Sequence, residues 1–156
     1  SQRRLIPDSI KYLRSNKSIY LRNPNFNRPW QFVLEPLRGY LLLAMKQFYK
    51  PKKYSGAWNF GTEKNSGKSV KEIVEYIIEF WGSGKLKESK QNKFYEQENL
   101  QLNIQKSRKK LNWKPTYNIR KSVQVTVDWY KQVLNQKRKP IDTTKEQIYK
   151  YMDESK

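Results

Sequence analysis

The sequence predicts an α/β domain made mostly of helices with a few short strands. Apolar residues recur every three or four positions over 37–48, 70–81 and 119–134, which is the period of a helix packed on one face. Stretches with strand propensity are short, at 18–21 and 57–60. No strand–helix–strand succession is long enough to predict a parallel sheet.

The first half of the chain is predicted to alternate short helices with these strands. Pro7 suits the first turn of a helix, because its missing N–H has no partner there. The strand at 18–21 ends in an Asn-Pro-Asn break, and a loop then leads to a helix over 36–49, which Pro36 opens in the same way. Gly61 closes the second strand.

The second half is predicted to be helical. Ser69 and Glu72 form a capping box, the pattern in which each side chain accepts a hydrogen bond from the other's backbone at a helix start. That helix ends at Gly82. Further helices are expected over 104–111, over 119–134 and from a second capping box at 143–146 onward, the last with Ile148 and Met152 on its apolar side.

The length and composition fit one domain with a modest core, at 156 residues and 36% hydrophobic content. No apolar run approaches the length of a membrane span. There is no cysteine and no histidine, which excludes disulfides, thiolate metal sites, the usual zinc ligand and the usual general base. The first residues do not resemble a signal peptide, and we expect a cytoplasmic protein.

The net charge is +19, from 33 basic and 14 acidic residues, and a charge of this size suggests a polyanionic partner. However, the lysines are scattered along the sequence, and no recognised nucleic-acid motif is present. Aromatic residues that could stack on bases, such as Tyr40, Phe48, Phe80 and Trp81, occupy core-like positions. A nucleic-acid partner is therefore not expected, although a basic polyanion-binding module stays an alternative.

The most informative stretch is Arg-Pro-Trp-Gln-Phe-Val-Leu-Glu-Pro at 28–36, directly before a predicted helix. It would deliver Arg28 to the mouth of that buried helix. A guanidinium held next to a proline and an indole suits a phosphate, because its planar fork binds two oxygens at once. The alternative is a structural arginine that stacks on Trp30 or pairs with Glu35, since surface arginines are common.

This stretch, followed by Gly-Tyr-Leu-Leu-Leu-Ala at 39–44, resembles the CDP-glucose 4,6-dehydratase family of the extended short-chain dehydrogenases/reductases. The departure within the run is Phe32, where the family usually has His. The resemblance implies that 1–156 is the C-terminal, sugar-nucleotide-binding part of an extended Rossmann-type dehydratase, whose dinucleotide-binding half is absent. The other matching stretches lie at 4–8, 19–24, 57–61, 80–82, 111–115 and 126–130.

For the whole enzyme, the resemblance implies that CDP-glucose becomes CDP-4-keto-6-deoxyglucose with loss of water. NAD, bound by the absent half, would take a hydride from C4 of the sugar and return it to C6. The implied partners are the nucleotide sugar, the NAD-binding half and further copies of the enzyme. The apolar helix faces at 37–48 and 70–81 need cover, and part of it would come from that half. A related epimerase or dehydratase that uses another nucleotide is an alternative.

The resemblance also implies which residues bind the substrate. Arg28 matches the family's substrate-binding arginine, which contacts the diphosphate. Tyr95 stands where the family has His, and Arg3 replaces a family Asp. The other candidates match segments along the phosphates, the nucleobase and the ribose: Arg4 and Leu5, then Ile19, Tyr20 and Leu21, and finally Tyr95 and Glu96.

No catalytic residue is assigned to this chain. The glycine-rich turn that lets a backbone approach a dinucleotide pyrophosphate is absent. The Tyr-x-x-x-Lys pattern, in which lysine lowers the phenol pKa, occurs at Tyr49…Lys53 and Tyr117…Lys121. A chain this rich in Tyr and Lys holds about two such spacings by chance. Pro51 also lies between Tyr49 and Lys53 and would break a helix through this pair. We assign no metal ligand in this chain.

We expect that purified 1–156 neither binds NAD with useful affinity nor dehydrates CDP-glucose, because the glycine turn and a credible Tyr–Lys pair are missing. Incubation with both compounds, followed by keto-sugar absorbance, should give no signal above background. Turnover by the purified chain would contradict this expectation.

Overall fold

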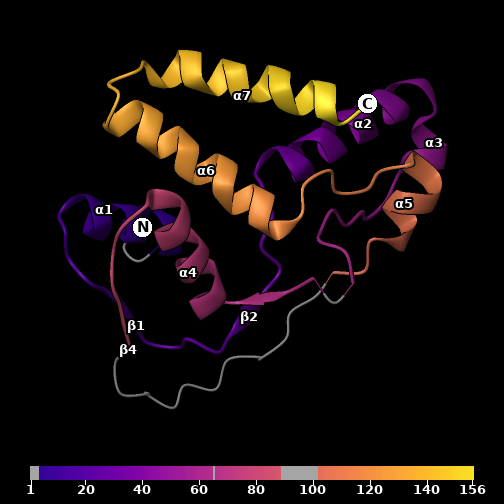
Figure 1. The fold of residues 1–156 in the computed structure, drawn as a ribbon. Coiled ribbons are helices and arrows are strands. Elements are labelled where there is room, and N and C mark those ends of the chain that lie inside the picture. Colours follow the sequence, from indigo (N-terminus) through magenta and orange to yellow (C-terminus); the bar gives the residue numbers. More distant parts are fainter. Residues whose placement is uncertain (1–3, 65, 89–101) are drawn as a thin grey trace.

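The structure is a computed structural model that describes residues 4–64, 66–88 and 102–156 (Figure 1). It is mostly helical with a few short strands, as the sequence predicts. The helices are α1 (Leu5–Arg14), α2 (Leu34–Tyr49), α3 (Pro51–Tyr54), α4 (Val70–Trp81), α5 (Gln105–Leu111), α6 (Ile119–Leu134) and α7 (Pro140–Glu154). The strands are β1 (Ile19–Leu21), β2 (Asn27–Arg28), β3 (Lys68–Ser69) and β4 (Leu86–Glu88).

The strands form two small pairs. β1 and β4 run parallel, in a register that joins Ile19 to Leu86, and β2 and β3 run antiparallel, with Arg28 opposite Lys68. The sequence did not predict a parallel pair. Three residues are too few to establish an alternating pattern, and β4 lies in a polar stretch, so only the pairing itself reveals it.

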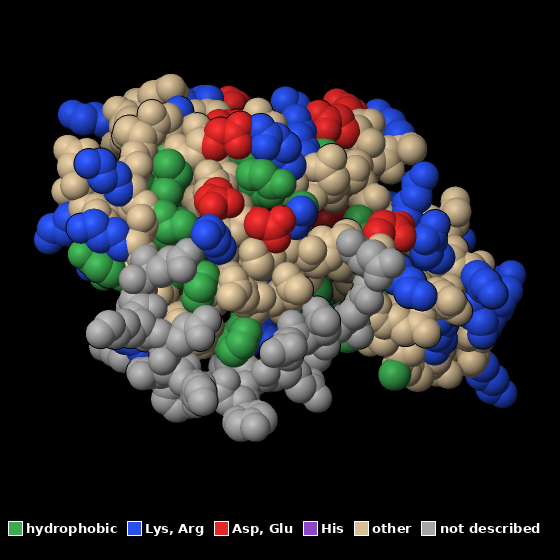
Figure 2. Space-filling view, turned by 60° about the horizontal axis from the view of Figure 1, so that its bottom comes forward, with side chains coloured by type: hydrophobic (Ala, Val, Ile, Leu, Met, Phe, Trp, Pro, Cys, Tyr) green, Lys and Arg blue, Asp and Glu red, His purple; other side chains and the backbone are tan. Residues whose placement is uncertain are grey.

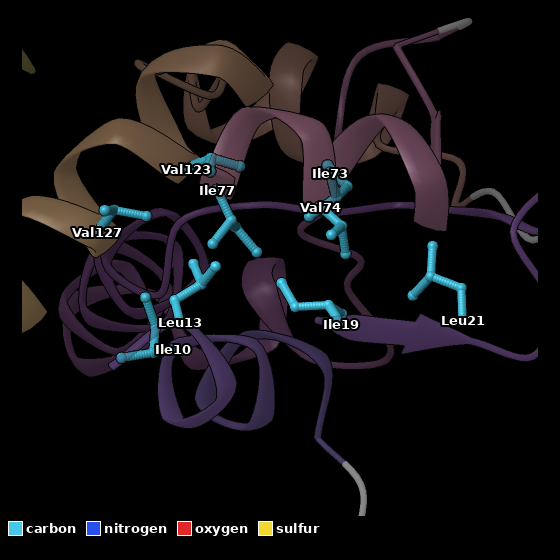
Figure 3. Packing of buried hydrophobic residues seen from close by; sticks show 9 residues of the cluster. All are labelled: Ile10, Leu13, Ile19, Leu21, Ile73, Val74, Ile77, Val123 and Val127. Atoms are coloured by element: carbon cyan, nitrogen blue, oxygen red, sulfur yellow. The ribbon is translucent and has the colours of Figure 1, made fainter. Parts of the chain in front are cut away.

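One core joins α1, β1, α4 and α6 on the left side of Figure 1. In α4, Ile73, Val74 and Ile77 are fully buried against the neighbouring elements. The expectation that the face at 70–81 needs cover from outside the chain is therefore wrong, because α1 and α6 supply it. The side chains that meet in this core are Ile10, Leu13, Ile19, Leu21, Ile73, Val74, Ile77, Val123 and Val127 (Figure 3).

The ends of α4 follow the sequence prediction. The Glu72 N–H donates to the Ser69 hydroxyl at 3.2 Å, and the Ser69 N–H donates to the Glu72 carboxylate at 2.8 Å, so the capping box is confirmed. A hydrogen bond from Lys68 and the backbone bond from Ser69 hold the pKa of Glu72 below its usual value. Gly82 ends the helix with φ of 96°, a left-handed conformation that costs glycine little.

A second core lies between α2, α3, α5 and the loop around 57–61. Phe60 packs edge-on against Trp113, with ring centroids 5.0 Å apart. A Cβ on Gly39 would lie 2.3 Å from the Phe60 ring, so only glycine lets α2 approach this closely. The predicted strand at 57–60 is absent, because the carbonyl oxygen of Asn59 accepts from the Ser107 hydroxyl instead of from a neighbouring strand.

A buried glutamate connects α2 to the C-terminal part of the chain. Glu35 is fully buried, and its carboxylate accepts from the N–H of Thr116 at 2.9 Å, the N–H of Tyr117 at 2.8 Å and the hydroxyl of Tyr151 at 2.7 Å. Its carbonyl oxygen also accepts from the Trp113 indole at 3.2 Å. These partners come from α7 and from 113–117, just before α6, so this one residue, through its side chain and its carbonyl oxygen, fixes how both helices meet α2.

Two helix starts differ from the predictions. α2 begins at Leu34, two residues before Pro36, which is still within the first turn, where backbone N–H groups have no helical partner. α7 begins at Pro140 and not at a capping box at 143–146. Proline fixes its own φ in the helical range and so starts the helix earlier. α7 also turns Tyr151 to the interior, toward Glu35, whereas Met152 is exposed.

One face of α2 stays uncovered within the described residues. Leu37, Leu41 and Met45 lie four residues apart along the helix, and Leu41 is 73% exposed. We call these three residues the α2 stripe. With the end of α7, the stripe lines an apolar groove of about 700 Å³. None of the described helices is long and apolar enough to span a membrane.

We expect 1–156 to self-associate through the α2 stripe, since an apolar patch left open to water recruits a partner or aggregates. The double variant Leu41→Glu, Met45→Glu should shift the chain toward monomer in light scattering. Ile141→Glu is the matched control, because Ile141 is similarly exposed but lies outside this groove. A thermally robust monomer of the unaltered chain would show that the stripe needs no partner.

We further expect Glu35→Gln to lower the free energy of unfolding by about 1.5–3 kcal/mol, because a charge-assisted bond is lost and an amide N–H₂ faces backbone donors. Glu79→Gln is the control. Glu79 is exposed and pairs with Arg120 on the surface, so its loss should cost less than about 1 kcal/mol. Denaturant unfolding followed by circular dichroism measures both. Equal midpoints for the two variants would contradict the structural role of Glu35.

Candidate functional site

A groove of about 410 Å³ lies between α1, β1 and the segment 22–28, with Val70 at the start of α4 as part of its lining. Every predicted substrate-binding residue that the structure describes lines it. Tyr95 and Glu96, predicted near the ribose, lie outside the described residues. The six that line the groove are Arg4, Leu5, Ile19, Tyr20, Leu21 and Arg28.

All three residues of β1 line this groove. The side chains of Ile19 and Leu21 are also buried in the core shown in Figure 3. Tyr20 alternates with them and is 59% exposed, with the Lys87 ammonium 6.0 Å from its ring centroid. This alternation is that of a strand with one face in the core.

Arg28 is held in place by its backbone and by an aromatic ring. Its strand β2 pairs with β3, and the Trp30 indole donates to the carbonyl oxygen of Lys68 at 3.0 Å, which ties the following residues to the same strand. The guanidinium carbon lies 5.8 Å from the ring centroid of Phe26. The aromatic ring next to the Arg28 guanidinium is therefore that of Phe26. The sequence-based alternative had placed Trp30 there.

The other alternative for Arg28, a pair with Glu35, does not form. The Glu35 carboxylate is buried, and its hydrogen bonds go to Thr116, Tyr117 and Tyr151. Glu35 thus acts at the start of α2, as expected of a carboxylate near a helix N-terminus.

The groove has seven further lining residues that were not predicted from the sequence: Asp8, Ser9, Tyr12, Arg22, Asn23, Phe26 and Val70. Asp8 and Tyr12 lie four residues apart on one face of α1, and Asp8 follows Arg4, the residue before the helix, at the same interval. That spacing could have indicated them. Arg22 directly follows β1 and lies in the stretch 19–24 that carries the resemblance, whereas no sequence pattern marks Phe26, which directly precedes β2. The groove therefore carries three arginines and one aspartate among its lining residues, a balance that favours an anionic ligand.

The basic side chains are scattered along the sequence, but they are not evenly distributed over the folded chain. On the face in Figure 2, Lys and Arg side chains are numerous at both ends of the molecule, and Asp and Glu lie mostly between them. The stretches 36–62 and 102–118, which build the second core, contain no Asp or Glu. Their basic residues are Arg38, Lys46, Lys50, Lys52 and Lys53 in the first stretch, and Lys106, Arg108, Lys109, Lys110 and Lys114 in the second.

Neither Tyr–Lys pair has the properties of a catalytic base. The pKa of Tyr117 is raised, mainly by burial and secondly by a hydrogen bond with Glu154. This is so even though the Lys121 ammonium lies 5.8 Å from the centroid of its ring. A base would need this pKa to be lowered. Tyr49 ends α2 and Lys53 lies in α3, so a helix boundary separates the other pair.

The sequence lacks the glycine-rich turn of an NAD site, and the described residues do not fit a metal ion. A dinucleotide site needs closely spaced glycines between a strand and a helix, and none of the six glycines in the sequence is arranged in that way. Within the part of the chain that the structure describes, no group of three or more acidic side chains could hold a metal.

The comparisons with known proteins agree with the sequence motifs. The CDP-glucose 4,6-dehydratase of Salmonella typhimurium strain LT2 is 34% identical to this chain over 129 residues. The match covers 82% of the chain and 36% of the Salmonella enzyme, so the chain spans about a third of that relative's length. No family model matches. The predicted resemblance to CDP-glucose 4,6-dehydratase is thereby confirmed.

Proposed function

We propose that this chain is the nucleotide-sugar-binding part of a CDP-glucose 4,6-dehydratase-like enzyme. The observation that carries the proposal is that all six described candidates, chosen from the resemblance, line one groove. They come from three consecutive elements within residues 4–28, namely the start of α1, β1 and β2. The similarity to the Salmonella enzyme over most of the chain supports the same assignment.

The groove offers the chemistry that a nucleoside diphosphate sugar needs. Arg28 would grip the diphosphate with its planar fork, and Arg4 and Arg22 would add positive charge along the phosphates. The main chain of β1 would contact the nucleobase, and Asp8 would accept from a hydroxyl group. Tyr95 and Glu96 stay predicted ribose contacts.

For the complete enzyme, we propose conversion of CDP-glucose into CDP-4-keto-6-deoxyglucose with loss of water. NAD would supply the hydride chemistry and would bind outside this chain. In this arrangement the α2 stripe packs against the NAD-binding half, since the described residues leave it uncovered. The complete enzyme would also assemble as a homo-oligomer.

Two alternatives differ in the ligand. A related dehydratase or epimerase would use the same groove with another nucleotide, and titration with CDP-, UDP-, GDP- and dTDP-glucose distinguishes them. A polyanion-binding role is favoured by the acid-free stretches around the second core. That role predicts tight DNA or RNA binding that weakens steeply with salt, whereas the groove predicts preference for one nucleotide sugar.

We expect Arg28→Lys in the complete natural protein to weaken CDP-glucose binding by roughly one to two orders of magnitude, because the charge remains but the bidentate fork is lost. Arg28→Ala should be worse. The matched control is Arg14→Ala, which removes an exposed arginine at the end of α1, outside the groove. Calorimetry measures affinity and circular dichroism checks the fold. Unchanged affinity in both Arg28 variants would mean that this arginine is structural.

A further inference from the structure

Phe26 is an aromatic residue of the groove that the proposed function does not use. Its ring is half-buried, and its carbonyl oxygen accepts from the N–H of Val70, the first residue of α4, at 2.9 Å. The backbone that carries Phe26 is therefore tied to α4, which is anchored in the first core. A ring mounted on this backbone has a fixed place beside the groove.

Phe26 directly precedes β2, and Arg28 is the second residue of that strand, so the two lie two residues apart. The Arg28 guanidinium lies over the Phe26 ring, with the 5.8 Å separation of a cation–π contact. Such a contact acts through the π face of the ring and uses no hydrogen-bond donor of the guanidinium, so it can restrict the rotamers of Arg28 without itself competing with a diphosphate.

We propose that Phe26 is a positioning residue, which holds the Arg28 guanidinium toward the groove and so pre-organises it for the diphosphate. The inference rests on the proposed function. Phe26 acts here through Arg28 and not through contact with the ligand. A fixed guanidinium loses less rotamer freedom when the ligand binds, and this saving raises affinity.

A double-mutant cycle with CDP-glucose and the complete natural protein tests the role. Phe26→Leu should weaken binding about three- to tenfold, whereas Phe26→Tyr, which keeps the ring, should stay within about twofold. In an Arg28→Ala background, Phe26→Leu should change affinity less than about twofold. Phe48→Leu is the matched control, because Phe48 is highly exposed on α2 and lies outside the groove.

The outcomes separate this proposal from its alternatives. An equal loss with and without Arg28 would mean that the ring contacts the ligand directly, and would overturn the positioning role. Unchanged affinity in Phe26→Leu would overturn it as well. If the unaltered protein does not bind CDP-glucose at all, the proposed function is instead rejected.

A second measurement needs no nucleotide sugar. Phenylglyoxal modifies accessible guanidiniums, and peptide mapping gives the rate at each arginine. If Phe26 holds Arg28, Phe26→Leu should raise the Arg28 rate about threefold or more, while the rate at Arg14 stays constant. An unchanged Arg28 rate would overturn the positioning role, whatever the protein binds.

Discussion

The fold depends on one buried carboxylate. Burying an ionised group away from water is costly unless hydrogen bonds replace the lost hydration. Glu35 receives them from two backbone N–H groups and the hydroxyl of Tyr151, so the loop before α6 and the helix α7 must both come to the start of α2. Burial, together with this hydrogen bond to Glu35, raises the pKa of Tyr151. Glu35 thereby links the two cores. Its bond with Trp113 connects it to the second core, and its bonds with the loop before α6 connect it to the first core.

Much of the sequence that carries the family resemblance serves this packing. Gly39 admits the Phe60 ring, and Phe60 in turn packs on Trp113. Phe32, which departs from the family pattern, is buried and packs against Tyr117 and Tyr151, with ring centroids 5.7 and 6.0 Å away. In this chain these residues of the matching stretches support the packing, whereas the proposed ligand contacts line a separate groove.

The first core places that groove. Ile19 and Leu21 anchor β1, and the capping box at Ser69 fixes the start of α4, whose first residue holds the backbone of Phe26. The loop that carries Arg28 thus rests on a well-packed helix, which limits how far the guanidinium can move. Rigid support of this kind reduces the ordering cost of binding a charged ligand.

The elements with a strong local pattern could be predicted from the sequence. The period of 119–134, the capping box at Ser69 and the stop at Gly82 gave the helices α4 and α6 with their ends, because caps and periodicity act within a few residues. The six described residues that the family resemblance marked as substrate contacts all line the groove. Tertiary structure alone decided the parallel pairing of β1 with β4, the loop at 57–60, and the ring that faces Arg28. These depend on partners far apart in sequence, such as the Ser107 hydroxyl that holds Asn59, and a local pattern carries no information about contacts over that separation.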